Sequence, residues 1–364
     1  MIRPSSIDEL CEIVSTGTKL RLRGGGSKDA IGAPCDAQVI DMRGFAGIID
    51  YDPPELVLTV GAGTPLAEIE KLVASEGQML AFDPFDHGVM LGNDGGATIG
   101  GVIAAGVAGP ARMSRGGARD HLLGFTAVSG RGEAFVAGAK VVKNVTGYDL
   151  PKLMAGSWGR LAALTEVTLK VLPAPRTRLT LAMRGLDAPG AVAAMARALG
   201  TAAEVTAAAH LPDWRGEAVT ALRLDGFAES VAARAMMLPE FDAVEDGDAL
   251  WLAVRDASPL PPEWSLWRLI VAPGKAPGVI AALPDAQWLF DWAGGLVWLA
   301  IAADPITIRA AAEASGGHAM LVRASEAMRR TVTTLHPQPP ALAAIEARVR
   351  RAFDPKGVFE IGRF

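Results

Sequence analysis

A glycine-rich loop, Arg23-Gly-Gly-Gly-Ser-Lys28, directly follows the alternating residues 19–23, which predict a β-strand. Consecutive glycines let several backbone N–H groups turn toward one point, where they bind an anion such as a pyrophosphate. The loop is not a Walker sequence, because no Gly-Lys-Ser/Thr follows four spacer residues. It is not the G-x-G-x-x-G motif of Rossmann folds either, since Gly26 leads into no clear helix. From this motif alone, a plain glycine-rich turn is an equally good alternative.

Two further stretches carry small residues at which a backbone can approach a ligand closely. Residues 97–105 predict a short helix of small residues, and residues 106–116 follow with several glycines. Two separate glycine-rich walls suit an extended dinucleotide better than a single phosphate, although tight turns alone would also explain them. A later stretch, Lys140 to Pro173, ends in an alternating strand at 164–172 and should close the same site.

The elements that must position these residues predict an α+β protein of two domains. Strand and helix patterns alternate up to Pro173, and Pro173-Ala-Pro175 marks a domain boundary. Residues 266–322 show the β-α-β-β-α-β order of a ferredoxin-like fold, and residues 179–237 resemble a looser copy. We therefore expect a first domain at 1–175, with subdomains at about 1–60 and 61–175. An α+β cap domain should follow at 176–324, and helices and a tail at 325–364 should return to the first domain.

Composition excludes several classes of protein. The chain has 364 residues and a formal charge of −5, so it carries no basic footprint for nucleic acid. Its two cysteines, Cys11 and Cys35, have no metal-type spacing and suggest free thiols in a reducing compartment. The first residues contain no signal peptide, and no long uncharged apolar stretch predicts a transmembrane helix. These features favour a cytoplasmic protein.

Three motifs resemble the PCMH-type FAD-binding domain of the vanillyl-alcohol oxidase family. They are Arg-Gly-Gly-Gly-Ser at 23–27, Ala-Thr-Ile-Gly-Gly at 97–101, and Gly-Tyr-Asp-Leu at 147–150 with Leu-x-x-Gly-Ser-x-Gly at 153–159. Within that family, residues 106–125 and 143–161 are similar to a flavoprotein subunit of bacterial glycolate oxidases. The resemblance covers residues 1–173 and returns in the last dozen residues. It implies that the dinucleotide is FAD.

The resemblance also implies roles for individual residues. The contacts it implies are Arg23, Gly24, Gly25, Gly26, Ser27 and Lys28 around the pyrophosphate; Pro84, Thr98, Ile99, Gly100 and Gly101 on the flavin side; Gly106, Gly109, Arg112, Gly116 and Ala118 along the ribityl chain and phosphates; and Gly159 and Val167 at the adenine half. Some members attach FAD covalently through a histidine at the position of Ser27. With serine there, FAD should be held non-covalently.

The catalytic residues are unknown from the sequence. Related 2-hydroxyacid dehydrogenases bind a divalent metal through a histidine pair, but none of the five histidines here forms such a pair by spacing. We therefore predict no metal site. His87 and His121 are the two candidates for a base that takes a hydroxyl proton near the flavin, with structural roles as the alternative. His210 is expected at the end of a strand.

These features predict an FAD-binding subunit of a complex that oxidises glycolate to glyoxylate. The resemblance implies two partners, a second flavoprotein subunit that is the main catalytic chain and an iron–sulfur subunit, since this chain has no iron–sulfur cysteine motif. Any contact with a membrane would then be peripheral, through the complex. Two alternatives are a stand-alone FAD-dependent dehydrogenase of another 2-hydroxyacid or alcohol, and a non-catalytic assembly subunit with a flavin fold.

Overall fold

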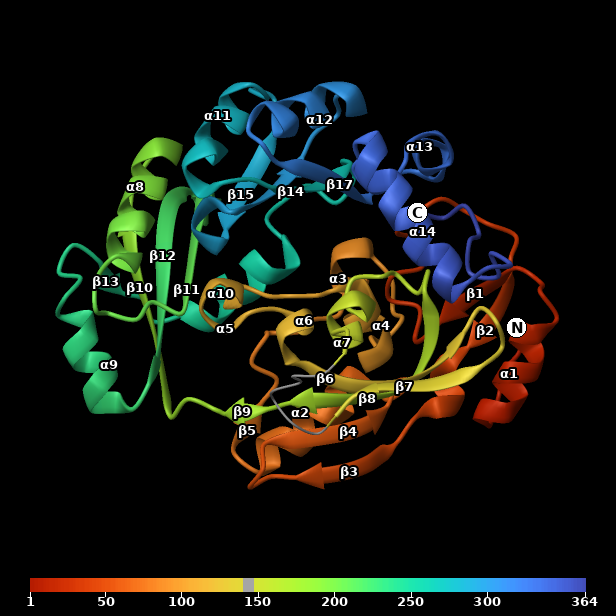
Figure 1. Cartoon of the computed structure of the whole chain (residues 1–364). Helices are drawn as coiled ribbons and strands as arrows, with labels where there is room; N and C mark the ends of the chain where they lie inside the picture. Colours follow the sequence, from red (N-terminus) through yellow and green to blue (C-terminus); the bar gives the residue numbers. More distant parts are fainter. Residues whose placement is uncertain (140–146) are drawn as a thin grey trace.

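The computed structural model describes residues 1–139 and 147–364, so the predictions made for Lys143 to Thr146 lie outside the described residues. Its strands form a five-stranded and an eight-stranded sheet, with two sheets of two strands beside them. Figure 1 shows the two large sheets in separate parts of the molecule, with the last helices returning to the first part. This arrangement confirms the α+β class. No helix in the described ranges is both long and apolar enough to span a membrane.

A small layer at the start of the chain carries the glycine loop. It consists of α1 (Ile7–Ser15), β1 (Leu20–Arg23), β2 (Gln38–Asp41) and η1 (Met42–Phe45). Ser6 caps α1, because its hydroxyl accepts a hydrogen bond from the Glu9 N–H at 3.2 Å. β1 and β2 pair in parallel, so the chain between them crosses over, and the glycine loop begins at the carboxyl end of β1. Ligands in α/β sheets bind at such strand ends.

The five-stranded sheet forms the body of the first part and has the order β3-β4-β8-β6-β7, antiparallel throughout. Its strands are β3 (Ile48–Asp52), β4 (Val57–Gly61), β6 (Leu122–Ser129), β7 (Ala134–Gly138) and β8 (Ala162–Lys170). The helices of this part are α2 (Leu66–Ser75), α3 (Gly88–Leu91), α4 (Ile99–Ala105), α5 (Arg112–Arg115), α6 (Ala118–His121) and α7 (Leu150–Met154). The boundary between the sheets lies between β2 and β3, earlier than the subdomain boundary expected near residue 60.

The eight-stranded sheet forms the cap and has the order β13-β10-β12-β11-β15-β16-β14-β17. Its strands are β10 (Thr177–Arg184), β11 (Ala207–Trp214), β12 (Glu217–Gly226), β13 (Asp242–Ala243), β14 (Leu266–Ile270), β15 (Gln287–Asp291), β16 (Leu296–Ala300) and β17 (His318–Arg323). In each half the first strand lies between the fourth and the third, and the second strand follows the third, so β11 and β15 meet in the middle of the sheet. That is the ferredoxin-like order, so the cap is two such units joined where His210 of β11 pairs with Phe290 of β15.

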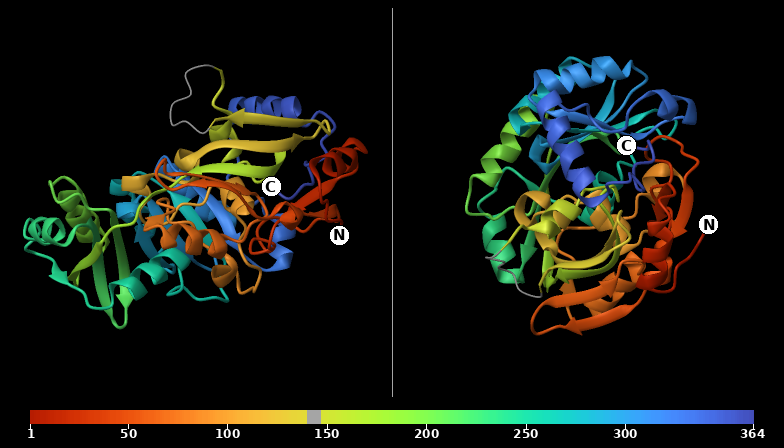
Figure 2. Two further views of the ribbon diagram at one scale, coloured as in Figure 1. Left: turned by 90° about the horizontal axis from the view of Figure 1, so that it is seen from below. Right: turned by 45° about the vertical axis from the view of Figure 1, so that its right-hand side comes forward.

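Alternating side chains separate the two faces of the cap sheet. In β14, Trp267 and Leu269 pack with the core of the cap, whereas Leu266 packs with the core of the first part. The helical elements of the cap are α8 (Ala188–Leu199), α9 (Ala228–Ala235), α10 (Gly247–Asp256), η2 (Pro273–Lys275), α11 (Ala276–Ala281), η3 (Trp292–Gly294) and α12 (Pro305–Ala314). Figure 2 shows the first half of the cap projecting away from the end of the molecule at which both termini lie.

The last residues of the chain return to the first part. α13 (Glu326–Thr331) and α14 (Pro340–Phe353) lead to residues 354–364, which lie beside β1 (Figure 1). The Leu20 N–H donates to the Val358 carbonyl at 2.9 Å. A further pair of strands, β5 (Gln78–Met79) and β9 (Leu172–Pro173), lies in the first part, and β9 comes directly before the chain enters the cap.

Candidate cofactor site

A long cleft runs between the glycine loop, α4, β8 and the last residues of the chain. It encloses about 1080 Å³ of empty space, counting the open solvent at its mouth. The predicted contact residues that line it are Arg23, Gly24, Gly25, Gly26, Ser27, Lys28, Thr98, Gly100, Gly101 and Gly159. Every lining residue comes from 20–164 or 359–364, and none comes from the cap.

The glycine loop presents unpaired donors to this cleft. Among the described residues, none accepts a hydrogen bond from the backbone N–H groups of residues 25–28. The loop is held from outside, because the Arg23 guanidinium pairs with Asp29 at 2.7 Å. Gly26 has a positive φ of 94°, which a side chain would strain. Several free N–H groups on one turn suit the anion site expected from the sequence.

Glycine at two loop positions also has a packing reason. A Cβ on Gly25 would lie 1.7 Å from the Gly96 carbonyl oxygen, and one on Gly24 would lie 2.1 Å from the Thr98 hydroxyl. The loop is therefore packed against residues 96–98 without space for side chains. Ser27 is buried beside these glycines. Lys28 is buried too, and this lowers its pKa to about 8, although the negative charge of Asp86 acts in the opposite direction.

The start of α4 forms the facing wall. Gly100 and Gly101 line the cleft, whereas the predicted contact Ile99 is fully buried in the core and does not line it. A Cβ on Gly101 would meet only the Thr98 hydroxyl at 3.4 Å, so this position faces open space. Unpaired N–H donors, a glycine cradle and a long apolar cleft fit the pyrophosphate and the ring systems of FAD.

Seven other predicted contacts lie outside the cleft: Pro84, Gly106, Gly109, Arg112, Gly116, Ala118 and Val167. Gly106, Arg112 and Ala118 line a second, smaller hollow. Gly109 packs against Asp83, and Gly116 packs against Asp120 with a φ of 78°. Val167 is fully buried in β8, and Ala162 and Leu164 of the same strand line the cleft instead.

Sequence reasoning missed a further group of cleft residues. Trp158, Ala162, Leu164, Phe359 and Phe364 line the cleft but were not among the predicted contacts. The signals for them were the stretch from Lys140 to Pro173, which holds the first three, and the resemblance of the last dozen residues to the family, which holds the two phenylalanines. Within the stretch that should close the site, Gly159 reaches the cleft with a φ of 71°, whereas Tyr148 is 91% exposed and Asp149 caps α7.

The two candidate histidines lie in different surroundings. His87 is buried and stacked on Phe85, and its Nδ1 has no partner among the described residues. Burial, and then the charges of Lys28 and Arg268, hold the pKa of His87 well below its usual value, so its ring is neutral. His121 is also buried, but its Nε2 bonds the Arg115 carbonyl at 2.7 Å, which fixes the neighbouring turn.

The remaining histidines do not form a metal site. His210 lies within β11 rather than at its end, and its Nδ1 lies 2.9 Å from the Thr220 hydroxyl. Its ring packs against Trp288 and Phe290 on the outer side of the cap sheet. Within residues 1–139 and 147–364, no group of three or more His, Cys, Asp or Glu could hold a metal ion.

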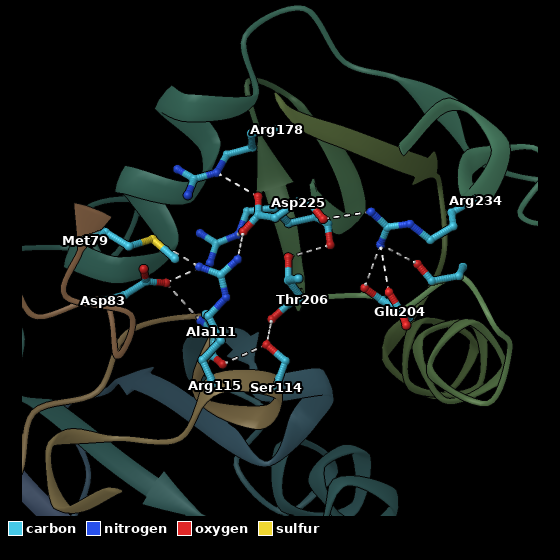
Figure 3. A network of polar contacts seen from close by, with 12 residues as sticks. Met79, Asp83, Ala111, Ser114, Arg115, Arg178, Glu204, Thr206, Asp225 and Arg234 are labelled. Carbon is cyan, nitrogen blue, oxygen red and sulfur yellow. Dashed lines mark hydrogen bonds and ion pairs between the residues drawn. The ribbon is translucent and has the colours of Figure 1, made fainter. Parts of the chain in front are cut away.

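Charged side chains join the cap to the first part. Figure 3 shows Arg115 and Arg178 reaching the same carboxylate, Asp225, at 2.6 and 3.0 Å. Arg223 pairs with Asp83 at 2.7 Å. The Asp83 backbone has a φ of 47°, and Asp83 directly precedes Pro84 of the predicted flavin side. The cap therefore contacts the turn that begins the flavin side.

A second contact of the cap centres on Trp292. Its indole N–H donates to the Gly109 carbonyl at 3.0 Å, and the guanidinium groups of Arg112 and Arg268 lie 4.7 and 5.2 Å from its ring centre. Among the described residues, no carboxylate forms an ion pair with the Arg268 guanidinium, which lies over the Trp292 ring. Burial raises the pKa of the neighbouring Asp291 to about 7. Positive charge therefore faces the first part from the inner side of the cap.

Comparisons with known proteins identify the cofactor domain. Residues 1–138 match the family described as FAD binding domain. The chain is 35% identical over 364 residues to the glycolate oxidase subunit GlcE of Escherichia coli (strain K12), covering 98% of this chain and 95% of that protein. It is 30% identical over 188 residues to the glycolate oxidase subunit GlcD of Bacillus subtilis (strain 168), covering 50% of this chain and 38% of that protein.

A solved structure shares the fold. An alkyldihydroxyacetonephosphate synthase superimposes with a TM-score of 0.65 at 14% identity, covering 98% of this chain and 74% of that chain. The matched domain and the unpaired donors of the cleft establish FAD as the cofactor. Because the identity to GlcE extends over nearly the whole of both chains, this chain belongs to the GlcE family of FAD-binding glycolate oxidase subunits.

Proposed function

We propose that this chain is the FAD-binding subunit of a glycolate oxidase complex that oxidises glycolate to glyoxylate. The observation that supports this most strongly is the cleft with unpaired N–H groups at residues 25–28, in a chain related to GlcE along its whole length. The partners in this proposal are a GlcD-like flavoprotein subunit and an iron–sulfur subunit. The complex works in the cytoplasm, and any membrane contact is made through the partners.

The residues of the cleft have distinct parts in this function. The N–H groups of residues 25–28 hold the pyrophosphate, and the glycines of α4 let the cofactor approach the backbone. When bound, FAD supplies the acceptor for the two electrons removed from a C–H bond. Ser27 offers no imidazole for a covalent bond, so the cofactor is held by these contacts alone.

On the cap side, His87 is the candidate for the proton. A neutral ring with an unpaired, buried Nδ1 can accept the proton of a hydroxyl group. Lys28 and Arg268 both lie close enough to lower the pKa of His87, so an anionic substrate would meet positive charge here. The Nδ1 of His121 is also buried and unpaired, but its Nε2 is bonded to the Arg115 carbonyl and no described charge on the cap side is placed beside it, so His87 is the stronger of the two candidates.

The experiment compares the chain alone with the chain co-expressed with its two partner subunits. Each preparation is mixed with glycolate without oxygen, and the flavin absorbance is followed. We expect FAD in both preparations and bleaching by glycolate only in the complex. Bleaching of the isolated chain would favour a stand-alone dehydrogenase, and a colourless chain that takes up no added FAD would overturn the proposal.

A further inference from the structure

The segment from Asp83 to Met90 carries His87, and the cap holds it at both ends. At the first end, Arg223 of β12 pairs with the Asp83 carboxylate at 2.7 Å. At the other end, Arg323 of β17 donates to the Met90 carbonyl at 2.8 Å. Because β12 and β17 belong to different ferredoxin-like units, each unit of the cap supplies one arginine to this segment.

The Asp83 backbone has a conformation that needs such support. Its φ is 47°, although non-glycine residues rarely have a positive φ and a residue before proline normally has an extended backbone. The carboxylate oxygen that meets Arg223 also accepts the Ala111 N–H at 3.1 Å. Strain of this kind persists only where the surroundings impose it, and it concentrates at functional sites. These contacts therefore fix the chain at the residue where the segment begins.

Arg323 fixes the other end by binding backbone carbonyl groups. Besides Met90, its guanidinium donates to the carbonyl groups of Pro261 and Trp264, in the loop before β14. One guanidinium can hold several carbonyl groups because its N–H donors have a rigid, planar geometry. Helix α3 has only 4 residues, and a single turn is not stable without outside contacts. The bond to the Met90 carbonyl therefore determines where α3 lies.

Between these two ends, the His87 ring is buried with its Nδ1 unpaired among the described residues. Phe85 stacks on the ring, with centroids 4.5 Å apart and planes inclined by 10°. The guanidinium of Arg255, which also belongs to the cap, lies 6.0 Å from the centre of the Phe85 ring. Since no hydrogen bond fixes Nδ1, the position of the ring depends on how the backbone on either side is held.

We propose that Arg223 and Arg323 are positioning residues for His87. They hold the two ends of the segment, so that the ring stays buried where it can accept the proton of a substrate hydroxyl group. This inference rests on the role that the proposed function gives to His87, and it extends that role to two residues of the cap. It also gives the cap, which lines no part of the cofactor cleft, a direct effect on the chemistry.

The first test observes the His87 ring by nitrogen NMR of the isolated chain, with His87→Gln to identify its signals. In the wild type, burial and the charges of Lys28 and Arg268 keep the pKa of His87 well below its usual 6.5, and the neighbouring Asp86 carboxylate is bonded to backbone N–H groups. Arg323→Met should admit water to the ring, so its pKa should rise toward 6.5 and part of the rings should be protonated at about pH 6.

Asp83→Asn tests the first end of the segment. Asparagine tolerates a positive φ and keeps an acceptor for the backbone N–H, but it lacks the charge that pairs with Arg223. We expect the pKa of His87 to rise here too, by less than in Arg323→Met. Arg309→Met is the matched control, because Arg309 donates to carbonyl groups between α13 and α14, outside the segment. It should leave the His87 titration unchanged.

The second test measures how fast glycolate reduces the flavin of the complex. Arg323→Met should slow this step by about 10- to 100-fold, since a misplacement of about 1 Å can cost about 100-fold. His87→Gln should slow it by about 100-fold or more. The double variant should be within about twofold of His87→Gln, because a positioning residue acts only through the residue it holds. Arg323→Lys keeps a donor and should fall between Arg323→Met and the wild type.

Three results would overturn the inference. They are a His87 titration unchanged by Arg323→Met, rate losses that multiply in the double variant, and no rate loss in His87→Gln. Failure of the proposed function looks different, because glycolate would then bleach no wild-type complex, while the NMR titration would still test the two arginines. Thermal unfolding shows whether each variant is folded, and Arg323→Lys replaces Arg323→Met if the latter is not.

Discussion

The cofactor cleft and the seam between the first part and the cap are built from different groups. The cleft offers backbone N–H groups at 25–28 and glycines at 100 and 101. The seam is held by charged side chains, with Arg223 on Asp83 and Arg115 on Asp225. A site made of backbone groups needs glycine at fixed positions, so it can be recognised as a motif in the sequence. A seam made of side chains joins residues that are far apart in the chain, so no sequence motif marks it.

The largest effect should come from placing a charge in the cleft. We expect Gly101→Asp to abolish FAD binding, because a carboxylate facing the pyrophosphate costs about 4 kcal/mol for each pair of charges 4 Å apart at the surface, roughly a thousandfold in affinity. A Cβ at this position has space, so the chain itself should stay folded. Flavin content of the purified protein and the affinity of its ligand-free form measure the effect.

Gly101→Ala is the matched control. It adds the same Cβ without the charge and should retain FAD within about tenfold, so a similar loss in both variants would mean that the backbone at α4 does not face the cofactor. Gly25→Asp would be a poorer test. Its Cβ would collide with the Gly96 carbonyl, so lost binding there would not separate repulsion from misfolding.

For the cofactor cleft, the sequence predicted the lining glycines better than the lining residues of the strand β8. Gly24, Gly100 and Gly159 all reach the cleft, yet Val167 does not. β8 also carries an irregularity between Leu164 and Val167. Thr126 pairs with Glu166 but Ala127 pairs with Leu164, so Thr165 is an extra residue in β8. Because this bulge shifts the alternation by one residue, Val167 packs in the same core as Ala162 and Leu164, and alternation counted from sequence cannot reveal it.

The cap shows the same contrast. Its second unit follows the predicted β-α-β-β-α-β order, but β11 was expected only through His210 at a strand end, because Ala207 to Leu211 shows no alternation of apolar and polar residues. Nothing in the sequence indicated that Arg223 would meet Asp83. The four tryptophans Trp251, Trp267, Trp292 and Trp298 are buried, so they contribute to packing inside the protein.

The next largest effect should come from the seam. The Arg223 side chain is only 3% exposed and faces Asp83 and Asp225. Arg223→Met would leave both carboxylates without one of their cations, and removing one partner of a buried ion pair costs about 3–5 kcal/mol. We expect a fall of that size in the free energy of unfolding by urea, with a smaller change for Arg223→Lys. A loss below about 1 kcal/mol would mean that water reaches the seam and screens these charges.

The pH dependence of stability gives a smaller and separable effect. The pKa of Asp291 is raised by burial from its usual 3.8 to about 7, so between these values the folded chain binds a proton that the unfolded chain has lost. Asp291 therefore makes the protein less stable as pH rises from 4 to 7, by at most about 4 kcal/mol at about 1.4 kcal/mol per pKa unit.

Asp291→Asn should remove this dependence. Thermal unfolding at a series of pH values should show that the stability of the variant increases relative to that of the wild type as pH rises. Near pH 4 the two proteins should be equally stable. Its amide oxygen can still accept the hydrogen bond from the Trp292 N–H. Parallel curves for the two proteins would mean that Arg223 and Arg268 already compensate the charge of Asp291.

The smallest effect tests whether burial, rather than ion pairing itself, makes the seam strong. β10 and β12 carry two ion pairs, Arg178–Asp225 near the seam and Arg184–Glu217 at the far end, with N–O distances of 3.0 and 2.6 Å. The carboxylate of Asp225 is 1% exposed and that of Glu217 is 47% exposed. Exposed pairs contribute about 0–1 kcal/mol, so Arg184→Gln should change the urea unfolding free energy by less than about 0.5 kcal/mol. Arg178→Gln should lower the unfolding free energy more, because the buried Asp225 carboxylate then loses one of its cations and water cannot replace it. Equal losses would show that the shorter distance matters more than burial, and the seam would then differ from the surface in geometry rather than in solvent access.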